Sequence, residues 1–313
     1  MDHRPLGRSG LSIAPLMLGG NVFGWTADEA TSHRILDVFV AGGFNAIDTA
    51  DVYSAWVPGN AGGDSETVIG TWLKARGKRD DVVIATKVGM WPAKPGLSAA
   101  NIVAAAEESL RRLQTDYIDL YQSHKDDPDT PQDETLEAYE RLVRAGKVRA
   151  LGASNFEASR LRSALDLAAG KGGPRYDTLQ PAYNLMDRGI EGPLQQLCLD
   201  EGVGVISYYG LASGFLTGKY RSTEDLGKSP RGGTAKKHLE SERGPRVLAA
   251  LDQVAAETGA SPAQVALAWV IARPAVAAPI ASATSVEQLE ELMGAARLSL
   301  DPAHIARLDA ASA

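Results

Sequence analysis

Short runs of apolar and β-branched residues alternate along this chain with longer segments in which apolar residues recur at helical spacing. The short runs predict strands and the longer segments predict helices. The expected strands are Ala14–Gly19, Asn45–Thr49, Asp81–Val88, Tyr117–His124, Val148–Ser154, Thr178–Ala182, Val203–Tyr208 and Val276–Ala281. The expected helices are Asp28–Ala41, Ser65–Ala75, Ala99–Leu113, Asp133–Ala145, Ala158–Ala168, Pro193–Glu201, Pro262–Ile271 and Ser285–Ala296. This alternation predicts an α/β fold, a single (β/α)8 TIM barrel over residues 1–313.

Local signals at the ends of the helical segments support this division. Ser261-Pro262 places an N-cap residue before a proline at the first helical position. Ser285-Val286-Glu287-Gln288 fits a capping box. Gly146 and Gly170 are expected to end the helices that precede them. The alternative fold is an open doubly wound sheet, which a Gly-x-Gly-x-x-Gly turn after an early strand would favour, and the sequence contains no such turn.

Three segments fall outside the strand and helix repeat. Residues Arg4–Ile13 predict a β-hairpin that turns at Gly10 and plugs the bottom of the barrel. The segments Asp51–Asp64 and Tyr220–Gly244 are rich in glycine and polar residues. We expect both to be loop insertions at the C-terminal face, and the second to be either a binding loop or a mobile segment.

Composition and charge narrow the classes of protein. The 313 residues are 44% hydrophobic and carry a formal net charge of −7, which argues against binding nucleic acid through a general basic field. Cys198 is the single cysteine, so the chain can form neither an internal disulfide nor a cysteine-based zinc site. The N-terminus lacks a signal-peptide pattern, and no apolar run reaches the ~18 residues of a membrane span. We therefore expect a cytoplasmic protein that does not associate with membranes.

Polar or ionisable residues end most of the predicted strands, where barrel enzymes carry their chemistry. Burial of such groups is costly unless they are paired or used. Each residue alone has an ordinary interpretation: Asp48 as a helix cap, Lys87 as a surface lysine and His124 as a structural histidine. The strand-end residues are Asp48, Lys87, His124, Ser154, Asn155, Gln180 and Tyr208. Their joint placement predicts a site at the C-terminal mouth of the barrel.

The strings around these residues resemble the aldo-keto reductase family in order and spacing, over nearly the whole chain. No single string is decisive, but their order is specific. They are Asn45-Ala46-Ile47-Asp48-Thr49-Ala50-Asp51-Val52-Tyr53, Thr86-Lys87, Asp119-Leu120-Tyr121-Gln122-Ser123-His124, Gly152-Ala153-Ser154-Asn155-Phe156, Gln180-Pro181-Ala182-Tyr183-Asn184 and Gly214-Phe215-Leu216-Thr217-Gly218-Lys219. The resemblance implies an NAD(P)H-dependent oxidoreductase that reduces aldehydes or ketones to alcohols.

The resemblance also implies a catalytic role for four residues. Carbonyl reduction needs a hydride at carbon, which the nicotinamide supplies, and a proton at oxygen. Tyr53 is expected to be the general acid. A tyrosine ordinarily has a pKa near 10, and a neighbouring Lys87 ammonium is expected to lower it. Asp48 would hold Lys87 charged, and His124 would orient the substrate oxygen.

Later strand ends are expected to hold the cofactor. The resemblance implies that Ser154, Asn155 and Gln180 bind the nicotinamide carboxamide and that Tyr208 stacks on the ring. Gly210, Leu211 and the segment from Gly214 to Lys219 would cradle the pyrophosphate. That segment is one residue short of a P-loop and lacks Ser or Thr after the lysine, which argues against a nucleotide triphosphatase.

Adenosine recognition is expected near Ser282, Thr284 and Gln288. Many NADP-preferring family members place Lys or Arg in this segment, whereas this chain has hydroxyls and an amide, and Leu292 replaces a family-typical asparagine. A missing arginine fork weakens discrimination of a 2′-phosphate. We favour NADP(H) and keep NAD(H) as an alternative.

Aromatic residues in the loops after early strands are expected to wall a pocket for carbonyl substrates with an apolar body. They are Phe23, Trp25, Trp56 and Trp91. Basic residues of the second insertion would serve phosphates or an acidic substrate, or would lie on a solvated loop. They are Lys228, Arg231, Lys236 and Lys237.

Two other functions stay open. A non-catalytic, cofactor-binding redox-sensing subunit would use the same fold. A metal-dependent aldolase or isomerase would need several His, Asp or Glu ligands at the barrel mouth. Only Asp48 and His124 offer that, and Lys87 between them would repel a cation, so we expect no metal.

Overall fold

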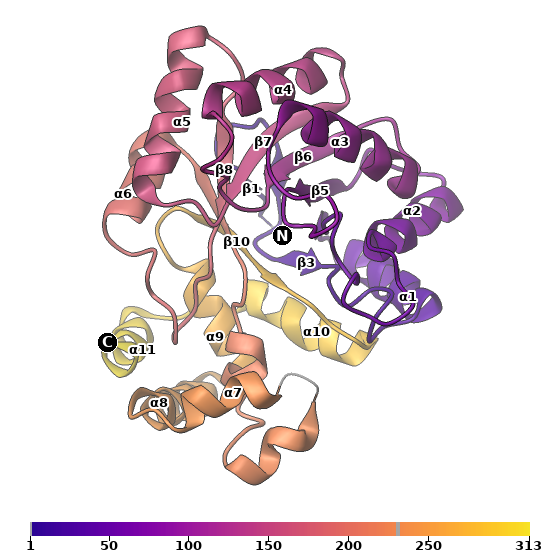
Figure 1. The fold of residues 1–313 in the computed structure, drawn as a ribbon. Helices are drawn as coiled ribbons and strands as arrows, with labels where there is room; N and C mark the ends of the chain where they lie inside the picture. The colour runs from indigo at the N-terminus through magenta and orange to yellow at the C-terminus, as the bar shows by residue number, and fades with distance from the viewer. Residues whose placement is uncertain (1, 230–231) are drawn as a thin grey trace.

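The computed structural model describes residues 2–229 and 232–313 as a closed barrel surrounded by helices (Figure 1). Eight strands form the barrel in the order β10-β3-β4-β5-β6-β7-β8-β9, and all neighbouring pairs are parallel. Their bounds are β3 (Met17–Gly19), β4 (Ala46–Asp48), β5 (Val83–Val88), β6 (Ile118–Ser123), β7 (Val148–Ser154), β8 (Tyr176–Gln180), β9 (Gly204–Ser207) and β10 (Val276–Ala281). The predicted (β/α)8 TIM barrel is confirmed.

Most of the helices lie where the periodicity predicted them. They are α1 (Glu29–Ala41), α2 (Asp64–Arg76), α3 (Ala99–Leu113), α4 (Gln132–Arg144), α5 (Ala158–Lys171), α6 (Pro193–Glu201), α9 (Pro262–Ile271) and α10 (Val286–Gly294), with the short 3-10 helix η3 (Ala295–Arg297) after the last. Helix α5 runs past Gly170 and ends at Gly172, so the expected stop at Gly170 is wrong. Gly172 has a positive φ of 64°, and its N–H bonds back to the last turn, which is the geometry that ends the helix.

The proposed helix caps are only partly as expected. Ser261 and Gln264 form a complete capping box at α9. At α10 the Ser285 hydroxyl accepts from the Gln288 N–H, but the Gln288 side chain accepts from the N–H of Thr284 instead of closing the box on Ser285. The expected box is therefore half formed.

The second insertion contains more regular structure than expected. It holds the 3-10 helix η2 (Thr223–Lys228) and the α-helix α7 (Gly232–Leu239), with the 3-10 helix η1 (Ala212–Thr217) before it and α8 (Arg243–Thr258) beginning at its end. The last helix, α11 (Pro302–Ser312), packs on α8, which in turn packs on α9 (Figure 1). The segment expected to be a binding loop or a mobile segment is thus partly helical, and α8, which follows it, buries apolar residues, among them Val247, Leu251 and Val254.

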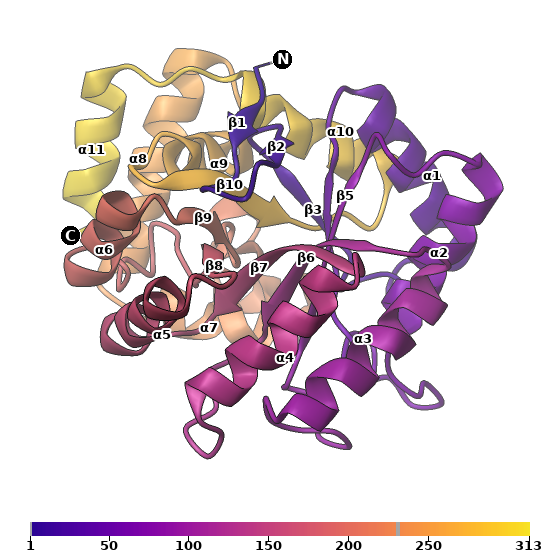
Figure 2. The same cartoon turned by 90° about the horizontal axis from the view of Figure 1, so that it is seen from above.

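The N-terminal hairpin closes one end of the barrel, as expected. Strands β1 (Arg4–Pro5) and β2 (Ser12–Ile13) pair antiparallel and lie next to β3 and β10 (Figure 2). Leu6 and Ile13 are fully buried and join a cluster with the first inward residues of the strands, including Met17, Ala46 and Val83. The interior at this end is therefore apolar.

A single strand shows how the barrel separates its two faces. Successive side chains of a strand point to opposite sides. In β6, Leu120 belongs to the interior cluster, whereas Tyr121 belongs to the larger core between strands and helices. Gln122 and His124 then follow on the inward side, towards the C-terminal end. No helix among the described residues is long and apolar enough to cross a membrane.

We predict that the plug depends on the absence of a side chain at Gly7. A Cβ there would lie 2.0 Å from the Asp177 carbonyl oxygen and 2.7 Å from the Gly204 nitrogen, and the residue has a φ of +59°. Gly7→Ala should lower the free energy of unfolding by about 3 kcal/mol or more, measured by urea denaturation. Gly10→Ala is the control, because its φ is +75° but its Cβ would meet nothing within 4 Å. That variant should lose only about 1 kcal/mol, from backbone strain. Equal losses in the two variants would contradict the steric role of Gly7.

Candidate active site

Four side chains that are distant in sequence meet at the C-terminal end of the barrel. Asp48 ends β4, Lys87 lies near the end of β5, and His124 directly follows β6. Tyr53 reaches them from the loop after β4. The Lys87 Nζ donates to Asp48 Oδ2 at 2.7 Å, to the Thr49 carbonyl at 2.8 Å and to the Tyr53 hydroxyl at 2.9 Å. These three acceptors use all three protons of the ammonium.

Asp48 is held by donors on both of its oxygens. Its Oδ2 accepts from Lys87 and, at 3.3 Å, from the Tyr53 hydroxyl. Its Oδ1 accepts from Gln180 Nε2 at 2.9 Å and Gln122 Nε2 at 3.4 Å. Gln122 was not singled out as a site residue from the sequence. The signal was present, because a residue two positions before His124 on the same strand must point to the same side.

Burial controls the protonation of the donor residues. It raises the pKa of Tyr53 well above the usual value, and the Asp48 carboxylate adds to this effect. The net lowering expected from Lys87 is therefore not found, because burial and the Asp48 carboxylate both raise the pKa of Tyr53. Burial lowers the pKa of Lys87, and Asp48 acts in the opposite direction. Tyr53 thus keeps its proton throughout the neutral pH range.

His124 faces Tyr53 as a neutral imidazole. The ring centroids of the two residues lie 6.0 Å apart. Burial, and then the nearby Lys87 and Lys125, hold the pKa of His124 well below its usual value. Its Nδ1 is buried without a hydrogen-bond partner among the described residues. A buried polar atom without a partner suits an incoming oxygen or hydroxyl.

The residues expected at the nicotinamide are brought together by hydrogen bonds. Ser154 Oγ donates to the Gln180 carbonyl at 2.8 Å. Asn155 has a φ of 57° and donates from Nδ2 to the His124 carbonyl and to Ser154 Oγ. The Tyr208 hydroxyl donates to Asn155 Oδ1 at 2.7 Å. This network links the two proposed halves of the site, because Asn155 touches both His124 and Tyr208.

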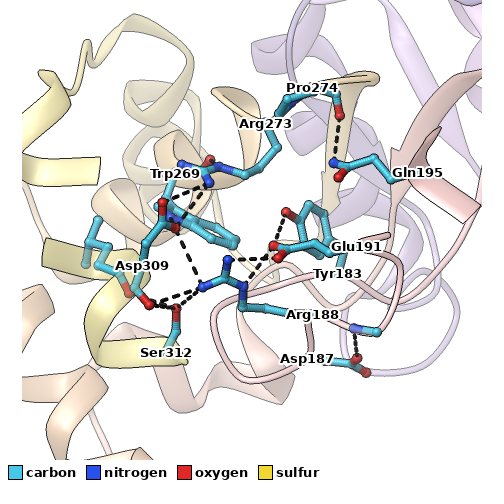
Figure 3. Close-up of polar contacts among 12 residues, drawn as sticks. Tyr183, Asp187, Arg188, Glu191, Gln195, Trp269, Arg273, Pro274, Asp309 and Ser312 are labelled. Carbon is cyan, nitrogen blue, oxygen red and sulfur yellow. Dashed lines mark hydrogen bonds and ion pairs between the residues drawn. The ribbon is translucent and has the colours of Figure 1, made fainter. Parts of the chain in front are cut away.

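The loop after β8 holds Tyr208 and its neighbour in place. Asn184 Nδ2 donates to the Tyr209 carbonyl at 2.9 Å. Further along this loop, Arg188 donates to both oxygens of Glu191 and to Ser312 Oγ of the last helix (Figure 3). The loop is therefore attached to α11 as well as to the barrel.

The expected pyrophosphate residues form a largely buried or half-buried segment after β9, in which only Lys219 is exposed. Gly210 is buried against Leu267, and Leu211 begins a bend at which Ser213 and Gly214 have positive φ. A Cβ at Gly214 would lie 3.2 Å from both Cε and Nζ of Lys219. Because Gly214 has no side chain, the Lys219 ammonium can lie close to its backbone. A positive charge next to accessible backbone N–H groups is suited to bind a phosphate.

The expected adenosine residues lie together around the start of α10. Ser282 Oγ donates to Asn21 Oδ1 at 2.6 Å, and Gln288 Oε1 accepts from both the N–H and the hydroxyl of Thr284. Leu292 is 5% exposed and packs in the core. Glu287 is exposed in the first turn of the helix, so the local charge there is negative.

Only two of the four expected aromatic residues lie near Tyr53. Trp56 is 49% exposed and its ring centroid lies 6.2 Å from that of Tyr53, and Trp25 packs edge-on against Trp56 at 5.7 Å. Phe23 is fully buried in the core, so its assignment to the pocket wall is wrong. The Trp91 ring instead lies against Gly62, with Lys94 and Arg112 over it.

The basic residues of the second insertion are largely paired. Lys228 forms an ion pair with Asp225, and its Nζ also donates to the Lys219 carbonyl. Lys236 lies 3.6 Å from Glu240. Arg231 lies outside the described residues. No group of three or more potential metal ligands occurs within residues 2–229 and 232–313.

The chain is similar in sequence to known proteins over most of its length. The profile of the Aldo/keto reductase family matches residues 15–313. The uncharacterized oxidoreductase YrpG of Bacillus subtilis (strain 168) is 38% identical over 312 residues, which cover 96% of this chain and 93% of the relative. Protein tas of Escherichia coli (strain K12) is 34% identical, with 99% and 97% covered. Aldo-keto reductase AFTS1 of Alternaria alternata is 33% identical, with 95% and 88% covered.

We predict that Lys87 and Asp48 stabilise the fold only as a pair. Lys87 is 0% and Asp48 is 1% exposed, so removing one partner leaves a buried charge without compensation. Lys87→Met should lower the free energy of unfolding by about 3–5 kcal/mol, measured by urea denaturation. The double variant Asp48→Asn/Lys87→Met should recover most of that loss. A double variant as unstable as the sum of the two single variants would contradict the pairing.

Proposed function

Because the chain belongs to the aldo/keto reductase family, it is an oxidoreductase that uses a nicotinamide cofactor, and we propose that Tyr53 donates the proton when it reduces an aldehyde or ketone. The observation that carries this proposal is the position of the Tyr53 hydroxyl, 2.9 Å from Lys87 Nζ and 3.3 Å from Asp48 Oδ2. A proton donor with a charged lysine behind it can deliver its proton and tolerate the negative charge that remains.

The residues after β7, β8 and β9 fit a bound dinucleotide. Ser154, Asn155 and Gln180 supply amide and hydroxyl groups for a carboxamide, and the half-buried Tyr208 offers a ring face. The bare backbone of Gly214 beside Lys219 suits the pyrophosphate. When bound, the cofactor supplies the hydride.

The substrate oxygen would lie between Tyr53 and His124. Tyr53 retains its proton at neutral pH, and a neutral imidazole can donate one hydrogen bond without adding a charge. Trp25 and Trp56 would contact the rest of the substrate, which favours carbonyl compounds with an apolar body.

Burial holds Tyr53 in its protonated form, which is the form that reduction uses. Oxidation of an alcohol would use the tyrosinate as base, and burial disfavours that form in the free protein.

The alternative is a redox-sensing subunit that binds cofactor without turnover. It predicts cofactor binding without oxidation in the presence of any carbonyl. The complete set of Asp48, Tyr53, Lys87 and His124 in hydrogen-bond or ring contact favours catalysis, since a sensor has no use for a proton donor.

We predict that Tyr53→Phe removes the proton donor and leaves cofactor binding intact. The rate of NADPH oxidation with a panel of aliphatic and aromatic aldehydes should fall by about 10²–10⁴-fold. The cofactor affinity, measured by fluorescence titration, should stay within about twofold, because no proposed cofactor contact involves the Tyr53 hydroxyl. An unchanged rate in the variant would exclude Tyr53 as the acid. Cofactor binding by the unaltered chain without turnover on any aldehyde would favour the sensing subunit.

We predict a modest preference for NADP(H). A 2′-phosphate near Ser282 and Thr284 would meet hydroxyl and backbone donors but no arginine fork, so NADPH should bind less than about tenfold more tightly than NADH in fluorescence titrations. Gln288→Arg should increase the affinity for NADPH by about tenfold and leave that for NADH unchanged. Tighter binding of NADH by the unaltered chain would instead assign NAD(H) as its cofactor.

A further inference from the structure

Asp51 is a buried carboxyl to which the proposed reaction gives no role. It is 1% exposed, and no side chain among the described residues donates a hydrogen bond to its oxygens; the backbone N–H of the adjacent Val52 is close enough to lower its pKa. Its backbone N–H donates to the Lys87 carbonyl at 3.2 Å, so this part of the loop lies alongside the end of β5. A carboxyl that is buried without partners costs free energy. Its place in the loop between Asp48 and Tyr53, beside the backbone of Lys87, points to a use for its charge.

Titratable groups face Asp51 from each element packed around it. They are Glu66 of α2, Arg112 of α3, Lys87 of β5, Tyr121 of β6 and Tyr139 of α4. Arg112 Nε donates to Glu66 Oε2 at 2.6 Å, and Thr86 Oγ1 donates to Glu66 Oε1 at 2.5 Å.

Asp51 differs from Glu66 and Asp48 because neither of the two nearby cations forms an ion pair with it. Arg112 pairs with Glu66, and Lys87 pairs with Asp48, so no cation is left to neutralise Asp51. Burial, together with the nearby Glu66, raises the pKa of Asp51 to about 7, while Arg112 and Lys87 act in the opposite direction. Asp51 therefore changes charge in the neutral pH range.

We propose that Asp51 is a positioning residue for the reaction, whose ionisation keeps the proton on the Lys87–Tyr53 pair at neutral and alkaline pH. The two side chains share a hydrogen bond of 2.9 Å and lose their proton as a coupled unit. A negative charge behind them raises the proton affinity of the pair, whichever of the two atoms releases the proton. In acid, Asp51 takes up a proton and the effect disappears.

This coupling would widen the pH range in which reduction proceeds. Burial lowers the pKa of Lys87, whereas Asp48, Asp51 and Glu66 each raise it. As the pH rises, loss of the Lys87 proton becomes more probable. Asp51 ionises as the pH rises, and its negative charge opposes that loss. A fixed charge would lack this response.

The first test rests on the proposed function and uses the pH dependence of kcat/KM for aldehyde reduction. Asp51→Asn removes the charge and keeps the shape. The alkaline limb of its profile should move about one pH unit towards acid. Below about pH 6 its rates should coincide with those of the unaltered chain, whose Asp51 is then protonated and neutral like the asparagine. Asp51→Ser also removes the charge and serves if the asparagine variant is too unstable to purify.

Asp177→Asn is the matched control. Burial raises the pKa of Asp177 to about 6, but its carbonyl oxygen lies beside Gly7, at the plugged end of the barrel. This variant should leave the alkaline limb unchanged. Coinciding alkaline limbs in Asp51→Asn and the unaltered chain would overturn the proposal, as would an equal shift in Asp177→Asn.

A second test does not depend on turnover. The carbon signals of isotope-labelled lysines report the titration of Lys87, which is assigned from the signal lost in Lys87→Arg. Asp51→Asn should lower the pH at which Lys87 titrates by about one unit. An unchanged Lys87 titration would overturn the coupling even if the chain reduces aldehydes. A lowered titration pH of Lys87 would support the coupling even if no carbonyl is turned over. The coupling and the proposed function can therefore be contradicted independently of each other.

Discussion

The buried ion pair between Lys87 and Asp48 is the interaction on which the arrangement of the site depends. An ammonium and a carboxylate taken out of water cost several kcal/mol each unless their remaining donors and acceptors are satisfied. The barrel meets this requirement with groups from other strands: the Thr49 carbonyl, the Tyr53 hydroxyl and the amides of Gln122 and Gln180. The same contacts that make the pair tolerable also fix the position of Tyr53, the proposed proton donor.

The two ends of the barrel differ in polarity: one end has an apolar interior, and the other holds the polar residues of the candidate site. At one end, Leu6 and Ile13 of the hairpin complete an apolar interior with Met17 and the first residues of the strands. At the other end, the inward positions are polar, as the change from Leu120 to Gln122 along β6 shows. Lys87 and Asp48 at the open end are themselves buried, so their charges interact through a medium that screens them weakly.

Burial decides the protonation states that this chemistry needs. It keeps the phenol of Tyr53 protonated, and together with the nearby Lys87 ammonium it keeps the imidazole of His124 neutral. It also brings the pKa of Asp51 to about 7, because no cation is left for that carboxyl. Exposed groups at the same separations would be screened and would titrate near their usual values.

The sequence by itself predicted the barrel, because strand and helix periods differ, and it predicted that polar residues at the strand ends meet at one face. The same alternation predicts that Gln122 points inward with His124. The choice of Tyr53 and the roles proposed for the site residues came from the resemblance to the family. Only the tertiary structure decided that Phe23 is core, that the second insertion folds into helices, and that Tyr53 holds its proton more tightly than a free tyrosine. Burial and the pairing of charges depend on which distant segments pack together, and a local pattern does not contain that information.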